Sequence, residues 1–128
     1  MAEKVTGYAE EVVKLVAALK NDNCPTAAVQ RNLLAVHLAT VLAVHHRLLY
    51  DSENHLWELV ASLMGKEWSR NQHAALGLHG ETLEASCTAA LSLYKTAVAD
   101  VYDLFNDRQK AVVEHAKERC RQLQSASL

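Results

Sequence analysis

Proline and glycine are scarce in this chain, with one proline and four glycines among its 128 residues. Aromatic residues make up only 5% of the sequence, whereas hydrophobic residues make up 50% of it. Because tight turns depend on glycine and proline, few turns are expected, and the abundant leucine and alanine favour helix. The composition therefore predicts an all-α protein, and the length suits one domain over residues 1–128.

The four glycines are too scattered to build a phosphate-binding loop. The sequence contains no P-loop and no G-x-G-x-x-G motif, which excludes nucleotide enzymes of the common folds. The G-x-S-x-G motif of serine hydrolases is also missing. With no catalytic motif in view, we expect a protein that is not an enzyme and that carries no cofactor.

An excess of positive charge is missing too, since the formal net charge is −2 at pH 7. Nucleic acid is therefore not expected as a partner. No run of about 18 apolar residues is free of polar interruption, which argues against integral membrane contact. The N-terminal residues lack the apolar core of a secretory signal.

The cysteines follow none of the close spacings that hold metals or form redox pairs. There are three of them, Cys24, Cys87 and Cys120, far apart in the sequence. Free thiols in the cytoplasm or another reducing intracellular compartment are the simplest interpretation. Cys87 lies between Leu83 and Leu91 on an apolar stripe, so we expect it to be a buried small hydrophobic residue.

The most apolar stretch covers residues 27–50 and contains no glycine, proline or acidic residue. Between Leu33 and Val44 the only interruptions are His37 and Thr40. A helix that is apolar on every side is usually buried on every side, so this segment is predicted to be the central helix. Thr26 is a plausible N-cap, because Pro25 disfavours helix at the residue before it.

The end of this central helix has two interpretations. His45, His46 and Arg47 indicate that the chain leaves the core there, and residues 51–54 favour caps and turns. We favour a break, with Asp51 or Ser52 capping a new helix; the alternative is one rod that continues to Met64. Gly65 would end the next helix, and residues 77–80, with His79 between two glycines, form the loosest loop.

A second long helix is predicted over about residues 82–123. Its apolar positions are spaced by threes and fours over more than six turns, at Leu83, Cys87, Leu91, Tyr94, Val98, Val101 and Phe105. Asn106 and Asp107 are the only candidate interruption, and residues 124–128 are expected to fray. With a first helix over about residues 6–19, the prediction is an antiparallel helical bundle of four to five helices.

The seven histidines are the residues most capable of metal chemistry. The Glu-x-x-His pair of metal-binding bundles is missing, although the reverse spacing occurs at His55–Glu58 and His115–Glu118. The central helix offers no carboxylate, so no metal site is expected, and the weak candidates are His37, His45, His55 and His115. His37 and His45 are expected to be core histidines hydrogen-bonded across helices, with a pH switch as the alternative.

Three side chains are candidates for binding a partner: Trp57, Trp68 and His79. Each tryptophan either anchors an interface or caps one end of the core. We therefore expect a non-catalytic helical interaction or self-assembly module, an adaptor or subunit, that binds a protein partner or a second copy of itself. A dimer is the commonest such assembly. The alternative is a helical bundle that binds metal or haem through histidines.

Overall fold

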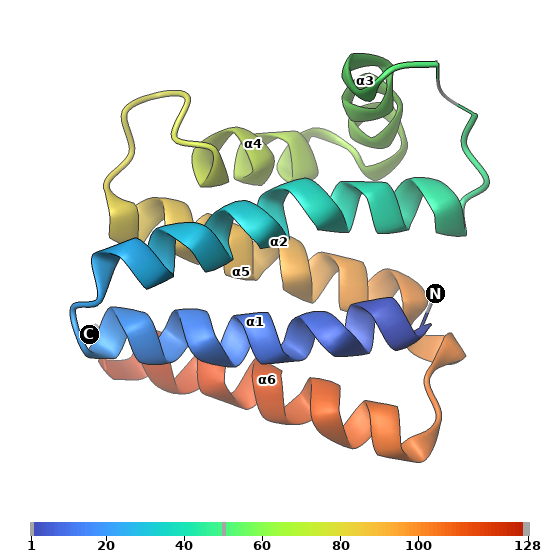
Figure 1. The fold of residues 1–128 in the computed structure, drawn as a ribbon. Coiled ribbons are helices and arrows are strands. Elements are labelled where there is room, and N and C mark those ends of the chain that lie inside the picture. The colour runs from blue at the N-terminus through green and yellow to red at the C-terminus, as the bar shows by residue number, and fades with distance from the viewer. Residues whose placement is uncertain (1, 50, 127–128) are drawn as a thin grey trace.

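The computed structural model describes residues 2–49 and 51–126, and within these ranges it contains helices but no strand (Figure 1). The predicted all-α helical bundle is confirmed, with six α-helices in the described part rather than four or five. They are α1 (Ala2–Lys20), α2 (Cys24–His45), α3 (Glu53–Met64), α4 (Lys66–Ala75), α5 (Leu83–Val101) and α6 (Asp107–Ala126). A short 3-10 turn, η1 (Tyr102–Leu104), separates α5 from α6.

The four long helices α1, α2, α5 and α6 form the body of the bundle. Helix α2 packs against α1 and α5, α4 packs on α5, and α6 packs mainly on α1 rather than on α5, its neighbour in sequence. Helices α1 and α6 run in one direction, and α2 and α5 run in the opposite direction (Figure 1). The C-terminal ends of α2 and α5 therefore lie at the same end of the bundle.

The core is formed mainly by α1, α2 and α5. Leu34, Leu38 and Leu42 of α2 lie on one helical face and are completely buried. The opposite side of α2 is not covered: Val29, Val36 and Val44 are 54%, 38% and 55% exposed. The expectation that α2 is buried on every side is therefore wrong. By length and composition α2 could cross a membrane, but a helix whose leucines fill a core meets the same criterion.

Helix α2 begins three residues earlier than predicted. Its N-cap is Asn23, whose Oδ1 accepts a hydrogen bond from the Thr26 backbone N–H at 3.3 Å. Pro25 lies inside the first turn, where its missing N–H would have had no partner in the helix anyway. The proline therefore supports the start of α2 instead of preventing it.

The break after the apolar stretch is confirmed, but the helix ends at His45 rather than at residue 50. Arg47 adopts a left-handed φ of 56°, its N–H donates to the Val44 carbonyl, and the Leu48 N–H donates to the Ala43 carbonyl at 2.9 Å. This pair of bonds is a Schellman motif, which ends a helix sharply. Ser52 then caps α3 by accepting from the His55 N–H, as predicted. Tyr50 lies outside the described residues.

The single long helix predicted over residues 82–123 is wrong. The chain turns at residues 102–106, and Phe105 there has an extended backbone. Asn106 and Gln109 each accept a hydrogen bond from the other's backbone N–H, at 2.8 and 2.9 Å. This reciprocal capping starts α6 without any glycine or proline. Helix α6 extends to Ala126, and residues 127–128 lie outside the described part; the fraying expected for residues 124–128 stays a prediction.

Gly65 joins α3 to α4 with φ 96° and ψ −177°, a conformation that is essentially restricted to glycine. Substitution Gly65→Ala should therefore lower the free energy of unfolding by about 1–3 kcal/mol. A Cβ at this position meets no atom within 4 Å, so the cost is backbone strain alone. Chemical denaturation monitored by circular dichroism measures it.

Gly7 provides the matched control, because a Cβ there also meets no atom within 4 Å, yet the residue lies inside helix α1. Gly7→Ala should raise the free energy of unfolding by about 0.5–1 kcal/mol. If both substitutions changed stability in the same direction, the strain assigned to Gly65 would be refuted.

Candidate functional site

The structure does not bring together the four histidines proposed as metal ligands from the sequence. His37 and His45 lie at different points of α2, His55 is on α3, and His115 is on α6. Among the described residues, one group of side chains has the composition and spacing of a metal site: His45, His46 and Asp100. We call this group the His–His–Asp cluster.

The cluster lies where the C-terminal ends of α2 and α5 meet. The His46 Nε2 atom is 2.6 Å from the Asp100 Oδ2 atom, and the His45 and His46 rings stand edge to face with centroids 4.8 Å apart. The Schellman motif fixes the backbone beside both histidines, and Asp100 projects from the last turn of α5. The His46 and Asp100 side chains are 29% and 26% exposed, so solvent reaches the cluster.

His37 is not a core histidine. It is exposed, and its ring stands edge to face with Tyr8 of α1, with centroids 6.0 Å apart. One residue before the buried Leu38, it is turned by about 100° from the face that enters the core. His45 is only partly buried, and the described residues give it no cross-helix hydrogen bond. The predicted pair of core histidines is therefore wrong.

The two His-x-x-Glu spacings do not form joint sites. His55 instead contacts Asp51, with Nδ1 and Oδ1 3.0 Å apart. Glu118 pairs with Arg121 at 2.9 Å, and His115 lies exposed on α6. Regular helical spacing alone therefore did not identify a ligand set in this chain.

The two tryptophans occupy different environments. Trp68 on α4 is only 2% exposed and is among the largest fully buried side chains, so it belongs to the core and is not available as a surface anchor. Its Nε1 atom is buried without a hydrogen-bond partner. Trp57 on α3 is partly buried and packs against the edge of the core. Of the two alternatives for Trp68, the structure therefore supports the core.

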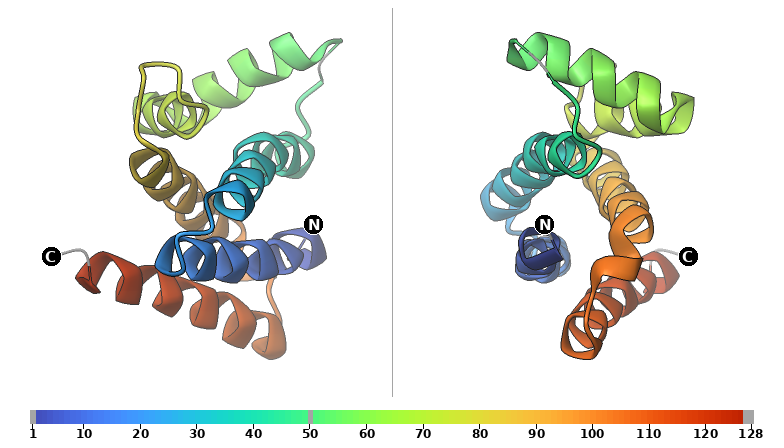
Figure 2. Two further views of the ribbon diagram at one scale, coloured as in Figure 1. Left: turned by 60° about the vertical axis from the view of Figure 1, so that its left-hand side comes forward. Right: turned by 90° about the vertical axis from the view of Figure 1, so that its right-hand side faces the viewer.

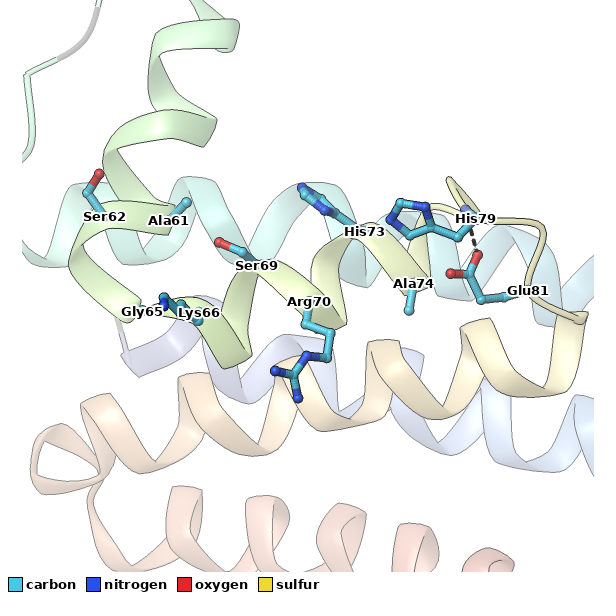
Figure 3. Close-up of a pocket in the computed structure, with 10 residues that line it drawn as sticks. All are labelled: Ala61, Ser62, Gly65, Lys66, Ser69, Arg70, His73, Ala74, His79 and Glu81. Carbon is cyan, nitrogen blue, oxygen red and sulfur yellow. Dashed lines mark hydrogen bonds between the residues drawn. The ribbon is translucent and has the colours of Figure 1, made fainter.

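His79 lies beside a surface pocket of about 580 Å³ formed by α3, α4 and the loop after α4 (Figure 3). Its backbone N–H donates to Glu81 at 3.0 Å, and its ring is 6.1 Å from that of His73. Lys66 and Arg70 also line the pocket, but Figure 3 shows Arg70 on the opposite side of α4 from His73. The basic groups therefore do not converge on a single point.

All three cysteines are free thiols, as the sequence predicted. Cys24 is exposed at the start of α2, whereas Cys87 and Cys120 are buried. Burial raises the pKa of the Cys87 thiol to about 11 and also raises the pKa of Cys120. The two buried thiols are therefore protonated near neutral pH and are poor nucleophiles.

The uncovered side of α2 is an apolar surface that follows one helix, and we call it the outer face of α2. Its residues follow a helical spacing: Val29, Leu33, Val36, His37, Thr40 and Val44. In the end-on view α2 lies at the edge of the bundle, and no helix is drawn beyond it (Figure 2, right). A pocket of about 460 Å³ between α1 and α2 runs beside this face and is lined by Val36, Val44 and Tyr8.

Sequence reasoning missed the cluster because its carboxylate comes from another helix. Asp100 is 54 positions from His46, so no helical spacing relates the two residues. The adjacent histidines were the available signal. Comparison with protein-family models, curated proteins and solved structures finds no match to this chain.

Proposed function

We propose that the protein is a non-catalytic helical module that associates with a second copy of itself through the outer face of α2. The observation that carries this proposal is the exposure of Val29, Val36 and Val44 along one side of a helix whose other side forms the core. Exposed apolar residues that follow one another along a face mark interaction sites, whereas isolated ones do not.

The charge of this face favours a second copy as the occupant. Between Thr26 and His45 the only charged side chain besides histidine is Arg31, which donates to Ser86 of α5 at 3.0 Å. Two outer faces related by a two-fold axis would therefore oppose no acidic or lysine side chain of α2, while Lys4 of α1 lines the neighbouring pocket. Such an isologous contact pairs the same surface on both subunits, which is the commonest symmetry of soluble oligomers.

The shape of the face supports the same arrangement. Helix α2 has 22 residues and is therefore about 33 Å long. The pocket between α1 and α2 lies alongside the exposed valines, so a valine of one copy has a recess to enter on the other. The complete core of the bundle, with its buried leucines, lets each copy fold before it pairs.

Light scattering after size exclusion tests this proposal, with samples up to about 1 mM because a weak dimer has a Kd in that range. The expected mass is twice the 14.1 kDa of the chain. Substitution Val36→Glu should produce a folded monomer, because pairing would bury two opposed carboxylates. Circular dichroism confirms that the variant keeps its helices.

Val112→Glu is the matched control, because Val112 is 39% exposed on α6, close to the 38% of Val36. This variant should keep the dimer. A wild-type chain that stays monomeric at every concentration would refute the proposal. So would a dimer that Val112→Glu disrupts and Val36→Glu does not, because that result would place the contact in the groove between α1 and α6.

A further inference from the structure

We propose that His45, His46 and Asp100 form a binding site for one divalent transition-metal ion, with Zn²⁺ as the ion that the ligands suit best. This inference does not depend on self-association. Its starting point is distance: the ligand atoms of all three side chains lie within 4.8 Å of one another. They come from two helices that are far apart in the sequence.

The identity of the ligands points to a transition metal. Imidazole suits Zn²⁺, Fe²⁺, Co²⁺ and Ni²⁺, whereas Mg²⁺ and Ca²⁺ prefer sites made of several oxygen atoms. Two histidines and one carboxylate are a recurring set for catalytic zinc and for non-haem iron. The cluster contains one carboxylate and two imidazoles, so it suits a transition-metal ion and does not suit Mg²⁺ or Ca²⁺.

The spacing requires only a small adjustment. Ligand atoms that share a tetrahedral Zn²⁺ ion at bonds of about 2.0–2.2 Å are about 3.4 Å apart. The His46 Nε2 and Asp100 Oδ2 atoms are already 2.6 Å apart, so the ion would separate them slightly and take the place of the proton they share. Rotation of the His45 side chain would bring in the third ligand.

The backbone around the cluster also favours a cation. Helix α2 ends at His45 and helix α5 ends at Val101, so the negative ends of two helix dipoles lie beside the three ligands. The same arrangement leaves one side open to solvent, since the His46 and Asp100 side chains are about a quarter exposed. A water molecule can therefore complete the coordination.

The chief alternative is that His46 and Asp100 form only a hydrogen bond that ties the end of α2 to α5. His45 separates the two explanations, because His45→Ala keeps that bond and removes a ligand. The chain also supplies a matched control in His55 and Asp51, a second histidine–aspartate pair at 3.0 Å for which the described side chains provide no third ligand.

The experiment is calorimetric titration of the full chain, prepared without a histidine tag, with Zn²⁺. One ion per chain is expected, and His45→Ala and Asp100→Asn should each weaken binding by at least about tenfold, because even the loss of a residue that only orients a ligand costs about 10–100-fold. His55→Ala should bind Zn²⁺ like the wild type. Co²⁺ should give the intense visible absorption of a four-coordinate site, and His45→Ala should lose it.

Thermal unfolding adds a second readout, because an ion that binds only the folded chain raises the melting temperature. Zn²⁺ should stabilise the wild type and His55→Ala but not His45→Ala. The proposal is overturned if the wild type binds no stoichiometric Zn²⁺, or if His45→Ala binds and is stabilised as well as the wild type. A loss of binding confined to His79→Ala would overturn it as well, because it would move the site to the loop after α4.

Discussion

Replacing Trp68 with alanine should lower the free energy of unfolding by about 3–5 kcal/mol, the usual cost of deleting a large aromatic side chain from a core. Trp68 is 2% exposed and lies on α4, which packs on α5. Its removal would leave a cavity in the core beneath α4. Urea denaturation monitored by circular dichroism measures the change.

Two further variants separate packing from polar effects at this position. Trp68→Phe should retain most of the stability, because the lost Nε1–H has no hydrogen-bond partner to leave behind. Trp57→Ala should cost clearly less than Trp68→Ala, since Trp57 is only partly buried. If the two alanine variants were equally destabilised, the placement of Trp68 in the core would be incorrect.

Raising the pH above 9 should progressively destabilise the fold, because four buried or half-buried acids stay protonated in it. Burial is the main cause at each of them: it raises the pKa of Cys87 from 9.0 to about 11 and raises those of Cys120, Tyr94 and Tyr8. The unfolded chain loses these protons first, so stability falls by about 1.4 kcal/mol per pH unit for each fully affected group.

The pH window follows from these shifts. For Cys87 the stabilisation is complete below pH 9 and is lost as the pH rises toward 11. Cys87→Ala removes this one titration, so the stability of the variant should fall less steeply with pH than that of the wild type. Urea denaturation at a series of pH values from 7 upward makes the comparison. Parallel slopes for the two chains would contradict the role given to Cys87.

The helices could be predicted largely from apolar spacing, and the interruptions only where a local signal was strong. Ser52 and Gly65 were recognisable because each acts on its own neighbours in the chain. The turn before α6 was missed, although Asn106 and Gln109 have the spacing of a capping box. The apolar residues before and after that turn follow the same helical spacing, so the sequence pattern did not indicate that the chain changes direction there.

The candidate site could not be predicted in the same way, because burial and proximity depend on tertiary packing. Trp68 has polar neighbours in sequence yet is buried, since it lies with Gln72 and Ala75 on the side of α4 that packs into the bundle. His37 has apolar neighbours yet is exposed, since it lies on the side of α2 away from the leucines. Asp100 gave no sequence signal, because only the parallel course of α2 and α5 brings it to the histidines.

The packing of α6 on α1 has a consequence for the order in which the chain can fold. These two helices are the first and last of the described part, and Ala9 and Val13 of α1 face a groove that Val112 of α6 also lines. Contacts between residues far apart in the sequence form late in folding, because the chain must lose the entropy of closing a long loop before the contacts can stabilise it. During synthesis, this side of α1 therefore stays uncovered until α6 has been made, and the nascent chain exposes an apolar surface before that point.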